Sequence, residues 1–70
     1  MNKYQKIYET LFPDDCLAND DPRRESIIAE MRDVCRAKTL VEAVKVINLW
    51  VWDSVRERNA FVRRARELAK

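Results

Sequence analysis

Apolar residues recur at helical spacing in three segments of the chain, at about residues 3–11, 22–36 and 40–68. One face of the first segment is formed by Tyr4, Ile7, Tyr8 and Leu11, and one face of the second by Ile27, Ile28, Met31, Val34 and Cys35. No segment alternates apolar and polar residues for long enough to predict a strand, and glycine, which tight hairpin turns favour, is absent. We therefore predict an all-α fold, a small three-helix domain with a short first helix and a long C-terminal helix.

Local capping patterns mark where these helices begin and end. Pro13 keeps the residue before it out of the helical conformation and so ends the first helix. Asp21 is a favourable N-cap for the second helix, with Pro22 at the first helical position, where a missing N–H is tolerated. Thr39 and Glu42 form a capping box at the start of the third. The short link between the second and third helices predicts an antiparallel hairpin.

The predicted third helix carries apolar residues on more than one face in its first half. At 100° per residue an inward stripe follows its whole length, whereas Val46, Leu49 and Trp52 point elsewhere, and Val41 lies close to Trp52. Arg58 falls at the centre of the inward stripe, where its side chain would extend to the edge of the bundle or pair with a carboxylate. A second apolar face, made of Val41, Val46, Leu49 and Trp52, therefore needs a cover.

Three different elements could cover this second apolar face. We expect a second copy of the chain, because the first two helices offer fewer large apolar side chains than the third helix needs. In that homodimer Leu49 and Trp52 would lie near the centre of the interface, since large buried side chains dominate such contacts. The alternatives are that the first helix wraps around to this face in a monomer, or that a different protein binds there.

Length and composition exclude several functional classes. Seventy residues form one domain, 1–70, near the lower size limit for independent stability. Histidine is absent, and Cys16 and Cys35 alone cannot complete a zinc site or form more than one disulfide, so we expect no metal. The absence of glycine removes phosphate-cradling loops, and no hydroxyl or thiol has a visible catalytic base. We expect no cofactor and no enzymatic activity.

Charge is unevenly distributed along the chain, although the net charge is only +2. Residues 1–22 carry a net charge of −3, whereas residues 53–70 carry +3. One ridge of the predicted third helix is basic and polar and consists of Arg56, Asn59, Arg63, Arg66 and Lys70. Such a ridge could lie along phosphates and read bases, but runs of charge more often form a solvated surface. A nucleic-acid-binding regulator is therefore the alternative function.

These features favour a small, non-enzymatic interaction or regulatory protein that binds another protein through helical apolar surface. Helical mini-proteins of this kind are typical of small accessory proteins, including those of phages and mobile elements. No charged-then-apolar leader precedes the first helix, and the apolar segment 40–55 is too short and too polar to span a bilayer. Because two free thiols fit a reducing compartment, we expect a cytoplasmic protein without a membrane partner.

Overall fold

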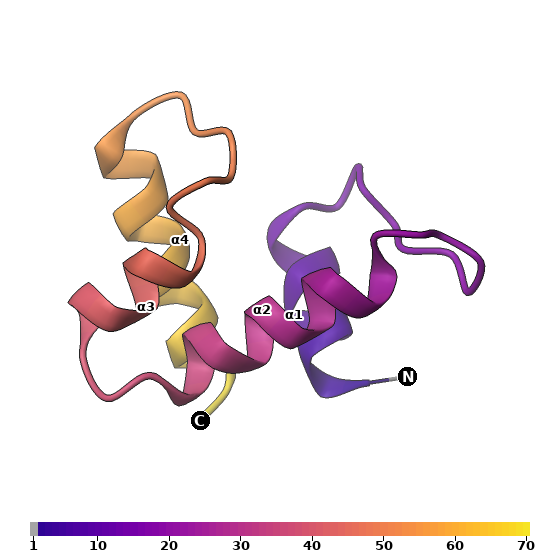
Figure 1. The fold of residues 1–70 in the computed structure, drawn as a ribbon, viewed down its shortest axis with the longest axis horizontal. Coiled ribbons are helices and arrows are strands. Elements are labelled where there is room, and N and C mark those ends of the chain that lie inside the picture. Colours follow the sequence, from indigo (N-terminus) through magenta and orange to yellow (C-terminus); the bar gives the residue numbers. More distant parts are fainter. Residues whose placement is uncertain (1) are drawn as a thin grey trace.

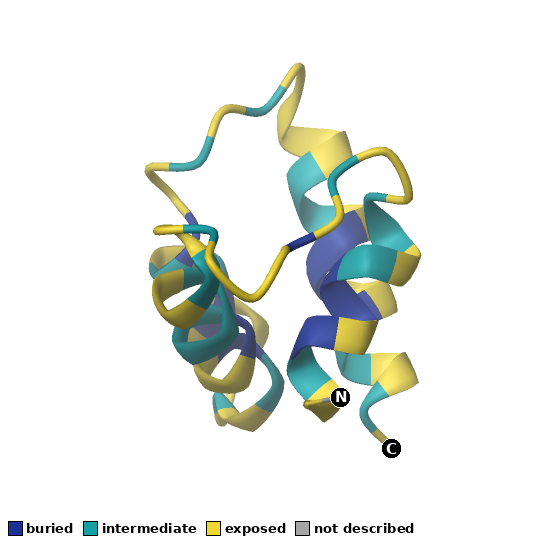
Figure 2. Ribbon diagram, turned by 90° about the vertical axis from the view of Figure 1, so that its right-hand side faces the viewer, coloured by how far each residue is buried: buried dark blue, intermediate teal, exposed yellow. Residues whose placement is uncertain are grey.

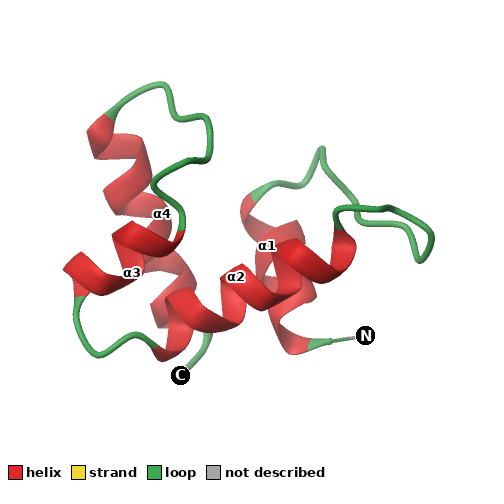
Figure 3. Ribbon diagram, viewed as in Figure 1, coloured by secondary structure: helices red, strands yellow, loops and turns green. Residues whose placement is uncertain are grey.

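Four helices make up the fold in the computed structural model, which describes residues 2–70 (Figures 1 and 3). They are α1 (Lys3–Leu11), α2 (Arg24–Arg36), α3 (Leu40–Val46) and α4 (Val55–Leu68). The part of the chain that the structure describes contains no strand, so the predicted all-α class is confirmed. Both α1 and α3 pack against α2 and α4, and the molecule measures 31 × 26 × 17 Å.

The single long helix predicted over residues 40–68 is wrong. The helix stops at Val46, and the chain turns through residues 47–54 before α4 begins at Val55 (Figure 3). Ser54 is in an extended conformation and its side chain accepts a hydrogen bond from the backbone N–H of Glu57, at 3.1 Å. The Glu57 carboxylate in turn accepts from the backbone N–H of Asp53, at 2.8 Å. These two bonds form a variant of the capping box, in which the carboxylate bonds the residue before the N-cap, and they start a new helix.

The other predicted boundaries agree closely with the structure. The Thr39 hydroxyl accepts from the Glu42 backbone N–H at 3.1 Å and caps α3, as predicted. Asp21 accepts from the backbone N–H of Arg23 at 2.8 Å, although the regular helix α2 begins only at Arg24, two residues later than expected. In Figure 1, α3 runs back in the direction opposite to α2, as the predicted hairpin requires.

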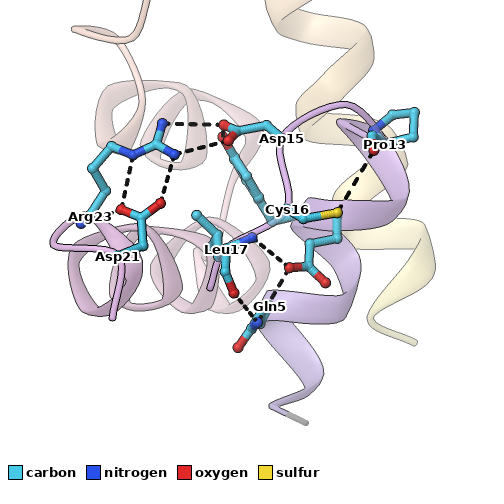
Figure 4. Close-up of polar contacts among 9 residues, drawn as sticks. Gln5, Pro13, Asp15, Cys16, Leu17, Asp21 and Arg23 are labelled. Carbon is cyan, nitrogen blue, oxygen red and sulfur yellow. Dashed lines mark hydrogen bonds and ion pairs between the residues drawn. The ribbon is translucent and has the colours of Figure 1, made fainter. Parts of the chain in front are cut away.

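The buried core draws on all four helices and on two residues outside them, Leu17 and Ile47. It consists of Ile7, Tyr8, Leu17, Met31, Val34, Ala43, Ile47, Phe61, Val62 and Ala65. Figure 2 shows that the buried positions are concentrated on the helices, while the long loops are largely exposed. Leu17 is held in place because Gln5 donates to its carbonyl at 3.0 Å and Glu9 accepts from its N–H at 2.8 Å (Figure 4). These two bonds anchor the acidic loop 12–23 to α1.

An ionic network holds the far end of the same loop (Figure 4). Arg23 pairs with Asp15 and with Asp21, each at 2.9 Å, and the Tyr8 hydroxyl donates to Asp15. The Arg23 guanidinium holds the pKa of both aspartates below the usual value. Burial, reinforced by the bond to Asp15, raises the pKa of Tyr8 to about 12. The tyrosine is therefore a neutral hydrogen-bond donor at physiological pH.

The loop between α3 and α4 contributes two tryptophans to an aromatic cluster. Trp50 and Trp52 stack with their ring centroids 6.0 Å apart, and both contact Phe61, at 5.8 and 5.1 Å. Tyr8 and Phe12 bring α1 into the same cluster, since Tyr8 meets Trp50 edge-on and Phe12 lies 6.3 Å from Trp52. Both indole N–H groups are satisfied: that of Trp50 donates to Glu30 and that of Trp52 to the carbonyl of Ile47.

Candidate interaction surface

A groove of about 500 Å³ lies between α3 and α4. It is lined by Leu40, Val41, Val44, Lys45, Asn48, Arg58, Asn59, Val62 and Arg63. This volume falls within the range of roughly 300–1,000 Å³ that is typical of ligand pockets. The lining divides into an apolar floor and a polar, cationic rim.

The floor consists of four aliphatic side chains. Val62 is fully buried beneath it and Val44 is half-buried, whereas Leu40 and Val41 are 42% and 66% exposed. The two exposed residues lie in the first turn of α3, immediately after the Thr39 cap. Complete burial of a large aliphatic side chain contributes roughly 1.5–3 kcal/mol of free energy. The chain loses part of this contribution for each of the two exposed residues. The floor is therefore an unpartnered apolar surface.

The rim carries three cations and no carboxylate among the lining residues. Lys45 and Arg63 are exposed, while Arg58 is half-buried and donates only to neutral amides, those of Asn48 and Asn59, at 3.4 Å. None of these cations lies within 4 Å of a carboxylate in the described residues, where the ion pairs involve other side chains. Arg58 lies about one turn before the buried Phe61 and Val62 on the same face of α4, as predicted, and its side chain extends to the rim of the groove without pairing with a carboxylate of the described residues.

The predicted second apolar face does not exist as one surface. Val46 and Trp52 are half-buried and pack against the core, whereas Val41 and Leu49 are exposed. The four residues fall on α3 and on the loop after it, so the helical wheel that grouped them does not apply. Of the four, only Val41 lines the groove.

The predicted basic ridge is also divided. Asn59 and Arg63 line the groove and Arg56 is exposed, but Arg66 has a structural role. Its Nη1 atom donates to the carbonyls of Val34 at 2.9 Å and Ala37 at 2.7 Å, where α2 ends. Lys70 makes an ion pair with Glu67, at 3.2 Å. Two of the four ridge cations, Arg66 and Lys70, are therefore engaged within the chain.

Sequence reasoning identified Leu49 as a side chain that faces away from the core, but it placed Val51 in the inward stripe. Leu49 and Val51 are 95% and 97% exposed, while Trp50 and Trp52 between and after them point into the aromatic cluster. Because all four residues of the stretch LWVW are apolar, no alternation of apolar and polar residues indicated this arrangement. The groove residues Leu40, Val44, Lys45 and Asn48 were likewise not predicted as a surface, because the wheel placed Leu40 and Val44 in the inward stripe.

The described residues offer little for covalent or metal chemistry. Both thiols are free; Cys16 is exposed, and burial raises the pKa of the half-buried Cys35. No three side chains of His, Cys, Asp or Glu gather as metal ligands in residues 2–70. Within the same range, no helix has both the length and the apolar character needed to cross a membrane.

Comparison with known proteins found no relative of this chain. No protein-family model matches the chain, and no curated protein and no solved structure is similar enough to count as a match. Function has to be argued from the chain's own surface.

Proposed function

We propose that this chain is a small, non-enzymatic interaction protein that binds another protein through the groove between α3 and α4. The single observation that carries the proposal is the groove floor, where Leu40 and Val41 are exposed next to Val44. Exposed apolar surface that is contiguous and rimmed by polar groups is typical of protein-binding sites. The two unpaired thiols support a reducing compartment such as the cytoplasm.

A protein partner fits this surface better than a nucleic acid does. Phosphate binding depends on a row of free cations, and Arg66 and Lys70 of the basic ridge have partners within the chain. Of the other two ridge cations, Arg56 lies outside the groove and Arg63 borders an aliphatic floor, which has no counterpart on a sugar–phosphate backbone. A polar rim around an apolar centre is the ordinary anatomy of a protein–protein interface.

Affinity capture from native host cells with matched variants tests the proposal. Val41→Glu places a carboxylate on the groove floor, and Val51→Glu makes the same change at an exposed site outside the groove. We expect wild type and Val51→Glu to retain one protein that Val41→Glu loses, while both variants keep the wild-type helicity. If the set of captured proteins is the same for all three baits, the groove is not the binding surface and the proposal is wrong.

As a second proposal, the exposed loop between α3 and α4 forms a contact with a second copy of the chain. Leu49 and Val51 are almost fully exposed and carry no charge, so a symmetric contact between two loops is free of like-charge repulsion. Two side chains alone fall short of the roughly 800 Å² per partner that a stable interface buries, so the dimer needs further contacts. Sedimentation velocity of wild type and Leu49→Asp decides this: a dimer that the substitution dissociates supports it, and a monomeric wild type at high micromolar concentration contradicts it.

A further inference from the structure

We propose that the groove between α3 and α4 binds an amphipathic helix of the partner protein whose polar flanks are acidic. This inference rests on the proposed function and adds the conformation and charge of the bound segment. Two features of the groove carry it: the shape of its floor and the uniform sign of its rim.

The floor is open and offers room for a short helix. Its aliphatic residues come from two helices that pack against each other, and the depression between them is open to solvent. The α3 wall has seven residues and is about 10 Å long at 1.5 Å per residue, which corresponds to about two turns of a bound helix. Helices bind such grooves through apolar residues at positions i, i+3 or i+4, and i+7.

The cationic rim favours acidic residues on both sides of the apolar face of the bound helix. Lys45 stands on the α3 side and Arg58 and Arg63 on the α4 side, so cations face the groove from both walls. They have no carboxylate partner within 4 Å in the described residues, and they would lie beside the two polar edges of a bound helix. Glutamate or aspartate on both edges would give each cation a counter-charge, whereas lysine or arginine there would be repelled.

The same charges argue against a second copy as the occupant. In a two-fold symmetric dimer the same surface of both subunits meets, so Lys45, Arg58 and Arg63 of both copies would lie in one interface. The apolar floor would be buried only by bringing six positive charges together. A foreign acidic helix buries the floor and neutralises the rim at the same time.

The test uses two synthetic, fluorescein-labelled peptides of about 18 residues, long enough to form helix in solution. Both carry leucine at i, i+3, i+4 and i+7; one has glutamate at the flanking positions and the other has lysine there. Binding to the full chain is measured by fluorescence anisotropy. We expect the glutamate peptide to bind at least about tenfold more tightly than the lysine peptide, and its affinity to fall as salt shortens the range of the charges.

Matched variants of the chain locate the site. Val41→Glu should weaken binding of the glutamate peptide by more than about tenfold, and Val51→Glu should leave it unchanged. The double variant Lys45→Gln/Arg63→Gln should weaken it by roughly 3- to 10-fold, because each exposed ion pair is modest. Arg56→Gln/Arg64→Gln removes the same charge from exposed positions of α4 outside the groove and should have no comparable effect.

Several outcomes would overturn the inference. These are equal binding of the two peptides, no binding of either at about 100 µM, or binding of the glutamate peptide that Val41→Glu does not weaken. Tighter binding of a duplex DNA, lost in Lys45→Gln/Arg63→Gln, would assign the cations to a nucleic acid, and a dimer lost in Val41→Glu would assign the floor to a second copy. A host protein captured through Val41, together with any of the peptide failures, would leave the proposed function intact and refute the acidic helix alone.

Discussion

The role of Arg66 at the end of α2 leads to a quantitative prediction. Its guanidinium reaches from α4 to α2, and one nitrogen donates to the carbonyls of Val34 and Ala37, at 2.9 and 2.7 Å. The carbonyl of Val34 is one of the last four of α2, which have no partner within the helix. The positive charge also lies at the negative end of the helix dipole. Arg66 therefore couples the two helices and caps one of them.

Replacing Arg66 by methionine keeps most of the aliphatic stem and removes both bonds. Hydrogen bonds from charged groups contribute about 1.5–3 kcal/mol, and the side chain is half-buried, so we expect a loss of about 1.5–3 kcal/mol of unfolding free energy. A chain of 70 residues has a total of only roughly 4–10 kcal/mol. At about 4–8 °C per kcal/mol, the melting temperature should fall by at least about 6 °C.

The measurement is thermal and urea unfolding followed by circular dichroism, with Arg63→Met as the matched control. Arg63 is on the same helix and is exposed, so its replacement should change the unfolding free energy by no more than about 0.5 kcal/mol. Arg66→Lys keeps the charge but not the planar donor geometry and should fall between wild type and Arg66→Met. If Arg66→Met and Arg63→Met differ by less than about 0.5 kcal/mol, the capping role is refuted.

Two further predictions follow from the loops. Ser54→Ala removes the N-cap of α4 and should lower the unfolding free energy by about 0.5–2 kcal/mol, whereas Ser54→Gly should lower it by only a few tenths, as judged by urea unfolding. Because the pKa values of Asp15 and Asp21 are lowered in the folded state, their contribution to stability is complete above the ordinary aspartate value of 3.8 and is lost as the pH falls through their folded values. Arg23→Gln should reduce this acid dependence below the ordinary aspartate pKa of 3.8 without changing its sign; an unchanged pH profile of the melting temperature would contradict the network.

The parts of the fold that the sequence predicts are those whose information is local. Thr39 and Glu42 specify the start of α3 within four residues, and the apolar periods of α1 and α2 identify the faces that are buried. Leu17 is buried in an irregular loop, and it is the one large apolar residue of an acidic segment, which is also a local pattern. None of these inferences needs to know how distant segments meet.

The break between α3 and α4 was missed although a local pattern marks it. Ser54 and Glu57 repeat the spacing of Thr39 and Glu42, and both pairs form capping bonds in the structure. The apolar residues keep a helical spacing across the break, and we gave this spacing more weight than the second capping pattern. The helical wheel therefore grouped residues of α3 and α4 that the turn separates. If residues 43–52 formed one helix, their apolar side chains would lie on every side of it and would need a cover. The same residues are equally well explained as the end of one helix followed by a turn.

The break, and with it the groove, is favoured by the two tryptophans. Two positions apart on a helix, Trp50 and Trp52 would point about 200° apart, so a continuous helix could bury one indole and would expose the other. In the turn both indoles stack and contact Phe61, and each N–H finds an acceptor. A continuous helix would also hold Val41 and Val62 about 30 Å apart along its axis, at 1.5 Å per residue. Turning the chain at residues 47–54 brings α3 beside α4, where these two valines line one groove. The proposed binding surface is therefore a consequence of burying both tryptophans.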